Sequence, residues 1–514
     1  MELELKTTQL NCYDTVLDTT LFQEETLESI VPDACPDILR IVDTEAAVCL
    51  GTKEAQEGRA EVTGTARCAV LYEAEGGGGV RRITVSIPFT CTAEAAGLTR
   101  LSRLSAEPRV MWADARSLNP RKVLVRVSLA VDVQAYAPQT ASFCDGVEDR
   151  EQSGIQTLEE VQTACFIVAV EEKTFTFSDD LSLSATRPAV AELLKRRVEL
   201  MCGESKLIGN KLIFKGEAAL HLVYRESGGS LCSADFTLPF SQIMEVSGAG
   251  EEADCTLSVV LTGIDCTLDG EDGRTMSVAL GMLAQAVVRE ERQVTLLADL
   301  YSTAYDLTVQ RRSYALARLL EHGERRITAR ELLETASPVR EVCDVHIHVG
   351  QVEAEQEGDQ GRLRAEFSAT VLYLSEEGVL ESVTRTISAA CPVELPAEAV
   401  CRCRCLSSGE GAAAPAGGGV ELRCPLEFRY LSLLPRQTAG VAQVRLEEDA
   451  PRDPAARPSI VLRSVEEGER LWDIAKAYGT TMEDIVQANG LGEEPPAACR
   501  VLLIPKKQIG RAHV

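Results

Sequence analysis

The segment EVTGTARCAVLYEAEGGGGVRRITVSIPF, from Glu61 to Phe89, decides the fold because it reads as two strands joined by a turn. Apolar and polar residues alternate along both arms, which is typical of strands with one buried face. The first arm ends near Tyr72, and four glycines, Gly76 to Gly79, interrupt the alternation. Glycine adopts the backbone conformations of tight turns at no steric cost, so the segment predicts a β-hairpin.

The same pattern occurs twice more, from Ile213 to Phe240 and from Leu363 to Ile387. Two landmarks keep almost the same spacing in all three copies: a tyrosine that ends the first arm and a proline upstream of it. They are Tyr72, Tyr224 and Tyr373, which are 152 and 149 residues apart, and Pro36, Pro188 and Pro338, which are 152 and 150 residues apart. Two independent landmarks in one register indicate a threefold internal repeat.

Each copy predicts a small β-rich unit. A second hairpin is expected after the first, with arms Arg109–Ala115 and Val123–Tyr136 in copy one, Leu257–Leu268 and Thr275–Val288 in copy two, and Val400–Leu406 and Val420–Leu431 in copy three. A short helical segment led by the upstream proline is expected at the start of each copy. Leucines and isoleucines also form an interrupted stripe at helical spacing from Ser313 to Thr335, which predicts a helical connector.

The 514 residues exceed the size of one domain, and the repeat predicts where the chain divides. We expect a mainly β chain of three tandem units, 1–165, 166–310 and 311–446, then a proline- and charge-rich linker, 447–458, a module, 459–505, and a tail, 506–514. Within the tail, residues 508–514 (QIGRAHV) match the translation of a common sequencing-adapter oligonucleotide, so they are left out of the fold prediction and the true C-terminus is unknown.

The C-terminal module changes to a strand, helix, helix, strand pattern. Apolar residues from Leu471 to Tyr478 recur at helical spacing, and Gly479 follows as a left-handed stop. Thr481 and Asp484 predict a capping box for a second helix, which ends at Gly490. The pattern predicts a small α+β domain.

The charge balance excludes several functions. Lys and Arg total 52 and Asp and Glu total 79, which gives a net charge of −27. Such a surface repels phosphate backbones and acidic headgroups, so nucleic-acid binding is not expected. No apolar run approaches the ~18 residues of a membrane span, and no export signal opens the chain. We therefore expect a soluble cytoplasmic protein whose 18 cysteines serve as reduced, mostly buried thiols.

No sequence motif for nucleotide binding, zinc-protease or serine-hydrolase chemistry appears, so neither enzymatic activity nor a cofactor is expected. The nearest approach to a metal site is Cys343, His346 and His348, alone or with Cys401, Cys403 and Cys405. These residues alternate along expected strands, which places their side chains in rows instead of around a tetrahedral centre. The glycines at 76–79 lead into a strand and not a helix, so a turn is favoured over a phosphate cradle.

The string RLWDIAKAYGTTMEDIVQANGL, from Arg470 to Leu491, closely resembles the LysM family. That resemblance implies a βααβ fold with a shallow groove for N-acetylglucosamine-containing glycans. The matching loops are Gly468, Glu469 and Arg470 before the first helix, and Asn489, Gly490 and Leu491 after the second. Two departures from the family, at Glu469-Arg470 and at 498–500, alter the usual sugar-facing polarity.

Trp472 is one of two tryptophans and stands beside the buried stripe of the first helix. Two interpretations stay open. It could be an exposed anchor for a partner, as tryptophans often are, or it could cover the edge of the module's own core.

The repeats resemble the SPOCS domain through QEETLESIVPDACPDILRIVDTEAAV, from Gln23 to Val48, and the glycine and tyrosine pattern after it. Three such domains followed by LysM resemble the clostridial SipL family of spore-coat morphogenetic proteins. That resemblance implies a mother-cell protein at the forespore surface whose LysM module binds a coat ATPase of the SpoIVA type. The alternative is a protein that binds peptidoglycan or cortex glycan. Self-association through the β-rich repeats is a further expectation.

Overall fold

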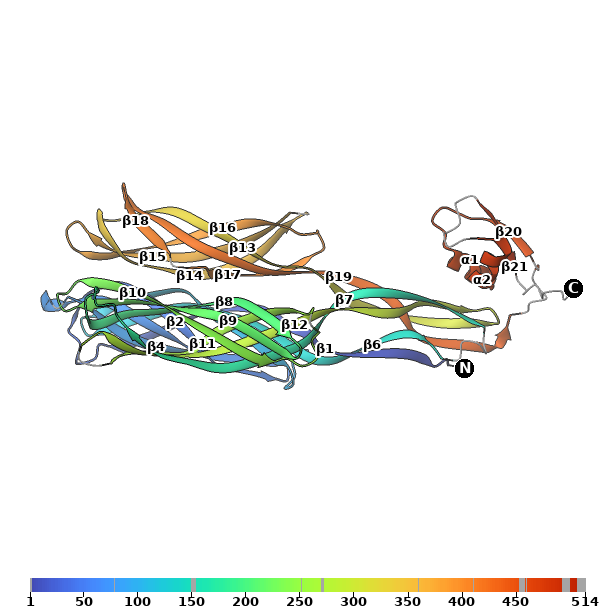
Figure 1. Ribbon diagram of the computed structural model, residues 1–514, viewed down its shortest axis with the longest axis horizontal. Coiled ribbons are helices and arrows are strands. Elements are labelled where there is room, and N and C mark those ends of the chain that lie inside the picture. Colours follow the sequence, from blue (N-terminus) through green and yellow to red (C-terminus); the bar gives the residue numbers. More distant parts are fainter. Residues whose placement is uncertain are drawn as a thin grey trace.

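The computed structural model describes residues 2–77, 79–148, 154–250, 252–269, 272–358, 360–409, 411–452, 458, 460–491 and 500–505. Three β-rich bodies lie together at one end of an elongated molecule, and long strands run from them into a stalk (Figure 1). The small C-terminal module lies at the far end of the stalk. The predicted fold class, mainly β with a small α+β domain at the end, is confirmed.

Each copy contains six equivalent strands. Copy one comprises β1 (Leu5–Ile30), β2 (Ile38–Gln56), β3 (Arg59–Ala74), β4 (Val80–Glu94), β5 (Arg103–Asn119) and β6 (Lys122–Val147). Copy two comprises β7 (Ile155–Ser182), β8 (Val190–Ile208), β9 (Lys211–Glu226), β10 (Leu231–Glu245), β11 (Asp254–Asp269) and β12 (Thr275–Ser302). Copy three comprises β13 (Tyr305–Glu334), β14 (Val339–Glu357), β15 (Gln360–Ser375), β16 (Leu380–Glu394), β17 (Val400–Ser407) and β19 (Gly419–Pro451), with β18 (Ala412–Ala416) inserted.

The six strands of a copy form two facing sheets. One is a three-stranded meander, with orders β2-β3-β4, β10-β9-β8 and β14-β15-β16. The remaining strands of copies one and two join in a single sheet of order β11-β12-β7-β1-β6-β5, and those of copy three form β13-β19-β17. The alternating face of the first predicted hairpin fills the core of copy one, where Ala66, Cys68 and Val70 are fully buried. Every cysteine in the described ranges is a free thiol that is buried or half-buried.

Both predicted hairpins are present in every copy. β3 pairs with β4, β9 with β10 and β15 with β16, and the second hairpins are β5 with β6, β11 with β12 and β17 with β19. In the first turn Gly76 has a φ of +75°, a conformation that favours glycine. A 3-10 turn, η1 (Glu75–Gly77), lies there.

The two helical predictions within the repeats are wrong. The segments after the prolines are the strands β2, β8 and β14, and Ser313–Thr335 lies in β13 apart from its last residue. β13 pairs with β19 along its length, with an irregularity between Leu319 and Glu321. A bulge shifts the strand alternation by one residue, so the leucines on its two sides take a spacing that imitates a helix.

The expected boundaries 165/166 and 310/311 fall inside the continuous strands β7 and β13. We propose instead that the copies are residues 5–147, 155–302 and 305–451, since each then begins with a long strand and ends with the strand that pairs with it. The first five residues of the expected linker lie in β19, whereas 453–457, 459 and the tail 506–514 lie outside the described residues.

The repeat landmarks are in contact with each other. The Tyr72 hydroxyl donates a hydrogen bond to the carbonyl oxygen of Pro36 at 3.0 Å, and Tyr224 donates to that of Pro188 at 3.2 Å. In copy three Tyr373 donates to the Glu381 carboxylate at 2.7 Å instead. A buried hydroxyl needs an acceptor, so this bond accounts for the common tyrosine-to-proline spacing in the first two copies.

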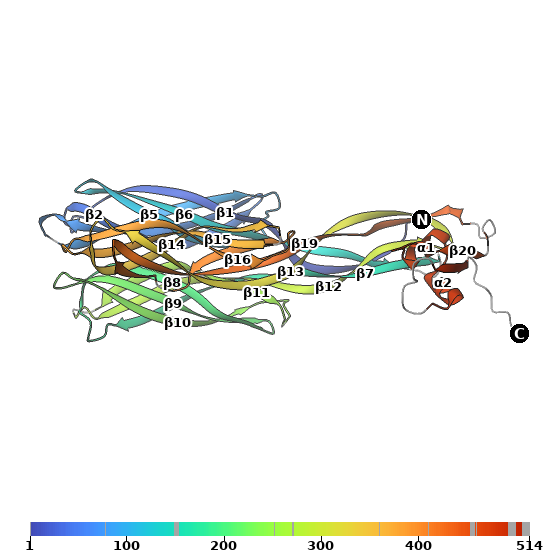
Figure 2. The ribbon, with the colours of Figure 1, turned by 90° about the horizontal axis from the view of Figure 1, so that it is seen from above.

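The stalk consists of three antiparallel ribbons (Figures 1 and 2). In each ribbon the beginning of a copy's first strand pairs with the end of its last strand: β1 with β6, β7 with β12, and β13 with β19. Their inner faces are apolar and meet in clusters that include Val147, Leu300 and Val444 near the tip. Phe143 stacks on Tyr314 further along, with ring centroids 5.6 Å apart. One ribbon alone would be marginal in water, so the three stabilise one another.

Candidate functional site

The C-terminal module has the expected βααβ arrangement. β20 (Ile460–Ser464) pairs antiparallel with β21 (Val501–Pro505), and α1 (Leu471–Tyr478) and α2 (Met482–Asn489) lie between them in sequence. Gly479 and Gly490 end the helices with φ of 60° and 56°, as predicted. The Thr481 hydroxyl accepts a hydrogen bond from the backbone N–H of Asp484 at 3.0 Å, which confirms the cap of α2.

The loop before α1 presents two of its predicted site residues to solvent. Gly468 and Arg470 are exposed, and Gly468 has a φ of +79°. Arg470 occupies the N-cap without a side-chain cap, and its guanidinium pairs with Asp473 at 3.0 Å. The Glu469 carboxylate instead accepts from Arg463 at 2.6 Å, so it holds the loop.

The loop after α2 is mostly structural. The Asn489 amide donates to the carbonyl oxygens of Ile485 at 2.8 Å and Leu503 at 2.6 Å, and accepts from the Leu503 N–H at 2.7 Å. Asn489 therefore ties α2 to β21. Leu491 packs against the module core, whereas Gly490 is exposed.

Trp472 is not an exposed anchor in this structure, because only 3% of it is accessible. Its indole N–H donates to the Asp299 carboxylate at 2.8 Å, and its ring packs edge-on against Tyr301 with centroids 4.9 Å apart. Both partners belong to β12 in the stalk. Trp472 thus covers the edge of the module core, as the second interpretation held, but does so together with another domain.

Asp299 and Tyr301 fasten the module to the stalk. The Lys476 ammonium contacts both Asp299 oxygens at 2.8 and 2.7 Å, and Arg311 contacts the same carboxylate at 2.6 Å. The Tyr301 hydroxyl donates to the carbonyl oxygen of Thr480 at 2.7 Å. Burial would raise the pKa of Asp299, but the hydrogen bonds from Lys476 and Trp472 outweigh it and lower that pKa. The contacts between stalk and module join residues 173 to 179 positions apart, so no local sequence signal links them.

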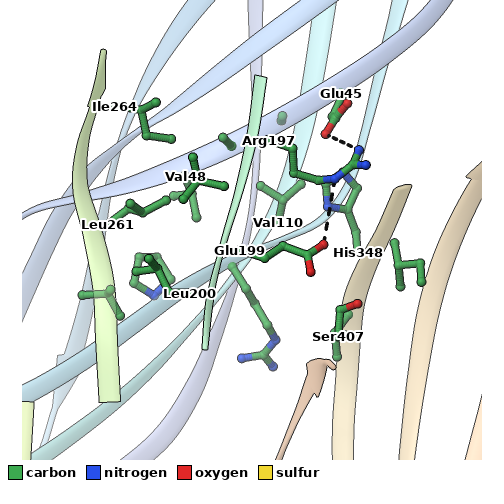
Figure 3. Close-up of a pocket in the computed structure, with 18 of the residues that line it drawn as sticks. Glu45, Val48, Val110, Arg197, Glu199, Leu200, Leu261, Ile264, His348 and Ser407 are labelled. Atoms are coloured by element: carbon green, nitrogen blue, oxygen red, sulfur yellow. Dashed lines mark hydrogen bonds and ion pairs between the residues drawn. The ribbon is translucent and has the colours of Figure 1, made fainter. Parts of the chain in front are cut away.

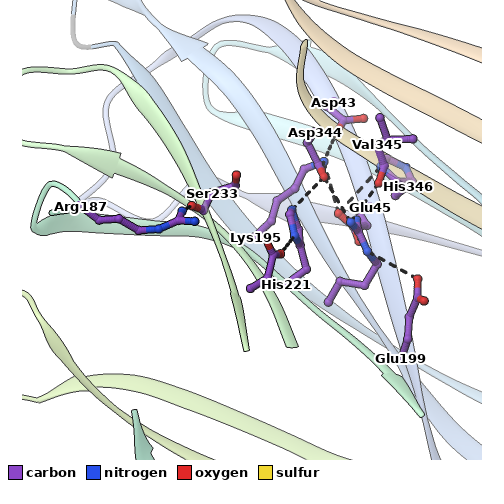
Figure 4. A network of polar contacts seen from close by, with 12 residues as sticks. Asp43, Glu45, Arg187, Lys195, Glu199, His221, Ser233, Asp344, Val345 and His346 are labelled. Carbon is purple, nitrogen blue, oxygen red and sulfur yellow. Dashed lines mark hydrogen bonds and ion pairs between the residues drawn. The ribbon is translucent and has the colours of Figure 1, made fainter. Parts of the chain in front are cut away.

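A second constellation lies where the three bodies meet. In each copy the strand after the proline has a register shift at the same place: between Ile41 and Asp43, Leu193 and Lys195, and Val342 and Asp344. The residue after the shift pairs with the one before the repeat tyrosine, so Asp43, Lys195 and Asp344 are equivalent positions. Two residues further on, Glu45, Arg197 and His346 are equivalent in the same way. We call these six residues the axial network; Figure 4 labels Asp43, Glu45, Lys195, Asp344 and His346 among them.

The axial network is a buried set of ion pairs between copies. Lys195 has a side-chain exposure of 1%; its ammonium lies 2.8 Å from Asp344 and 3.3 Å from Glu45, and also contacts Asp43. Arg197 bridges Glu45 at 3.0 Å and Asp344 at 3.2 Å. Burial alone would raise the pKa of Asp344, but Lys195 and Arg197 hold it well below its usual value. Asp344 is therefore ionised, and each of the two cations contacts both of the other copies.

The cysteine and histidine candidates do not converge on a metal centre. His346 and His348 stand in a row, with ring centroids 5.2 Å apart, and Cys343 packs in an apolar cluster with Val42 and Leu194. Cys401, Cys403 and Cys405 lie on β17 and pack against the core of copy three. Asp43, Asp344 and His346 have donor atoms within 4.8 Å of one another. The Lys195 ammonium contacts both carboxylates, so it takes the position that a metal cation would need.

Buried histidines make the fold sensitive to mild acid. Burial lowers the pKa of His348 to about 3, aided by His346, from an ordinary value of 6.5. Between these values the unfolded chain binds a proton at His348 that the folded chain does not, so the contribution of His348 to stability falls as the pH drops below about 6.5, by up to about 1.4 kcal/mol per pH unit.

We expect His348→Gln to make the urea midpoint less dependent on pH between 7.5 and 5.5 than in the wild type. His221, whose pKa is raised because its contacts with Asp344 and Asp235 outweigh burial, has the opposite effect in both chains. Equal pH dependence in the two chains would contradict this assignment.

A cavity of about 320 Å³ lies beside the axial network, between strands of all three copies (Figure 3). Arg67 and Arg196 in its wall donate to the carbonyl oxygens of Ile264 at 2.6 Å and Cys266 at 2.8 Å. These oxygens belong to β11, an edge of the six-stranded sheet, so the arginines protect that edge from further pairing. The Ser407 hydroxyl donates to the carbonyl oxygen of Gly409 at 2.9 Å and so is engaged with the backbone.

Comparison with known families finds two. The family described as SipL, SPOCS domain, matches residues 37–116 and 189–269, and the LysM domain family matches residues 464–505. The matched SPOCS segments begin at β2 and β8 and end at β5 and β11, and copy three has the same strand order. No curated protein matches the chain. Within the described residues no helix has the length and apolarity to cross a bilayer.

Proposed function

We propose that this chain, which is similar to SipL proteins in its SPOCS domains and its terminal LysM domain, is a non-enzymatic scaffold for assembly of the spore coat. It acts from the mother-cell cytoplasm at the forespore surface. The LysM module recruits a coat morphogenetic partner, an ATPase of the SpoIVA type. Both matched domain families are binding domains without catalytic activity.

One observation carries the proposal: the module sits at the far end of the stalk with one face anchored and its site loop open. Trp472 and Lys476 face the stalk, whereas Gly468, Arg470 and Gly490 are exposed. A module fixed in this way presents its loops at a set distance from the three bodies. Rigid presentation reduces the entropy that a partner's binding must overcome, which suits a scaffold.

Arg470 is the exposed residue at which partner binding can be tested most directly. Arginine is enriched at the centres of protein interfaces, and Arg470 is exposed and pairs with Asp473 at the loop surface. We expect Arg470→Ala to weaken binding of the full chain to a purified ATPase of this type by about tenfold, a loss of about 1.4 kcal/mol. Calorimetric titration measures it, with Arg445→Ala as the control, because Arg445 lies on the stalk with 71% of its side chain exposed. Equal affinities for both variants and the wild type would contradict the placement.

The alternative function, binding of peptidoglycan or cortex glycan, is favoured by the LysM match itself. Arg470 and Glu469 occupy the loop where the family usually has small polar groups, and Glu469 is engaged with Arg463. Sedimentation of the full chain with purified peptidoglycan distinguishes the two. The leading proposal expects the chain to stay in the supernatant; sedimentation that Arg470→Ala abolishes would favour the glycan.

Self-association through sheet edges belongs to the same proposal. The meanders end in the strands β4, β10 and β16, and within the part of the chain that the structure describes each of these is paired on one side only. Such edges offer unpaired backbone groups for added strands. They provide a route by which scaffold molecules assemble in a layer.

A further inference from the structure

The axial network carries different charges at equivalent positions of the three copies. The first layer has aspartate, lysine and aspartate at Asp43, Lys195 and Asp344, and the second has glutamate, arginine and histidine at Glu45, Arg197 and His346. All six residues contact residues of another copy. Copies that packed together only through apolar contacts would not need opposite charges at equivalent positions.

We infer that these charges select the copies that meet at the junction: it takes one second copy together with two acidic copies, and it rejects assemblies of first copies alone or of second copies alone. Three first copies would bury six carboxylates and no cation at the two layers. Three second copies would bury six cations. Like charges placed together without water are strongly unfavourable, so the mixed set, in which three carboxylates contact two cations, is favoured over either of these assemblies.

The contacts of Asp344 with copy two support the inference. Asp344 accepts from both cations, at 2.8 Å from Lys195 and 3.2 Å from Arg197, and has no exposed side-chain surface. His221 of copy two approaches the same carboxylate at 3.1 Å. The cations thus come from copy two, and the acids that balance them come from copies one and three. Neither flanking copy can replace the central one.

The connections between copies fit assembly within a single chain. Copy two ends at Ser302 and copy three begins at Tyr305, so only two residues join β12 to β13. A connection that short keeps the two copies side by side. The partner for which this surface is built is therefore the other two copies of the same chain, and a second molecule must bind elsewhere, for example at a sheet edge or at the LysM module.

Exchanging charges between copies within the full-length chain tests the inference. Asp43→Lys alone leaves two cations and one acid in the first layer, and Lys195→Asp alone leaves three acids. The double variant restores one lysine and two aspartates in permuted positions. We expect each single variant to lower the urea midpoint markedly and to form large oligomers in size-exclusion chromatography with light scattering. The double variant should recover most of the midpoint and the wild-type mass.

The matched control is the exposed pair Lys215 and Glu204, 4.0 Å apart, whose exchange should change nothing. A double variant no more stable than the sum of its single changes would overturn the inference.

An apolar first layer gives a second, independent result. Asp43→Leu, Lys195→Met and Asp344→Leu together remove every charge of that layer, a change that buried ion networks often tolerate. If the charges select the copies, this triple variant should fold but form concentration-dependent oligomers, because nothing then prevents like copies of different molecules from associating. A folded variant with the same mass distribution as the wild type would show that the charges do not select the copies.

Discussion

Replacing Lys195 with methionine is expected to lower the free energy of unfolding by about 3–5 kcal/mol, the usual cost of removing one partner from a buried ion pair. The ammonium contacts Asp43, Glu45 and Asp344, and side-chain exposures in this set are 8% or less. Methionine keeps most of the volume, so the loss comes from carboxylates left without a counter-charge. Urea denaturation followed by circular dichroism measures it.

Lys215→Met is the matched control, because Lys215 lies in the same copy with 65% of its side chain exposed. We expect it to change the free energy of unfolding by less than about 0.5 kcal/mol. Should Lys195→Met prove no more destabilising than this control, the axial network would have no part in holding the copies together.

The second large effect is expected at the stalk. Asp299→Ala removes the acceptor of the Trp472 indole and the counter-charge of Lys476 and Arg311. Hydrogen bonds to charged groups contribute about 1.5–3 kcal/mol each, so the docked state should lose more than tenfold in population. The module should leave the stalk and expose Trp472 to water.

Tryptophan fluorescence in a Trp112→Phe background, which leaves Trp472 as the reporter, measures this release as a red shift of the emission. Asp306→Ala, another stalk acid, which pairs with Arg452 at 2.8 Å, serves as the control. An unchanged spectrum for Asp299→Ala would mean that the carboxylate does not hold the module.

The threefold repeat and its hairpins could be predicted because their signals are local. Alternation marks one strand at a time, and β3 pairs with β4, which follows it after only a few residues. The same reasoning placed the helices and caps of the LysM module, since Thr481, Gly479 and Gly490 act on adjacent backbone.

The stalk and the junction depended on contacts that local patterns do not encode. Bulges in β13 disturb the alternation of apolar and polar residues, so the segment Ser313–Thr335 resembled a helix. The alternation in Glu61–Phe89 predicted one buried face, yet Arg67 on the opposite face donates a hydrogen bond to Ile264 of another copy. One sequence signal does indicate the axial network. When the three copies are aligned on their tyrosines, Asp43, Lys195 and Asp344 fall at the same position and carry opposite charges.

The predicted site residues have different roles in the structure. Arg470 and Gly468 lie at the open loop, whereas Asn489 and Glu469 hold the module together. The burial of Trp472 depends on β12, which its own surroundings could not reveal.

The most direct test of the scaffold proposal is the affinity of the purified chain for a purified SpoIVA-type ATPase, with and without residues 459–505. Circular dichroism of the shortened chain first establishes that the three copies remain folded, as their separate cores lead us to expect. We predict that the full chain binds and the shortened chain does not. Undiminished binding by the shortened chain would contradict the assignment of partner choice to the LysM module.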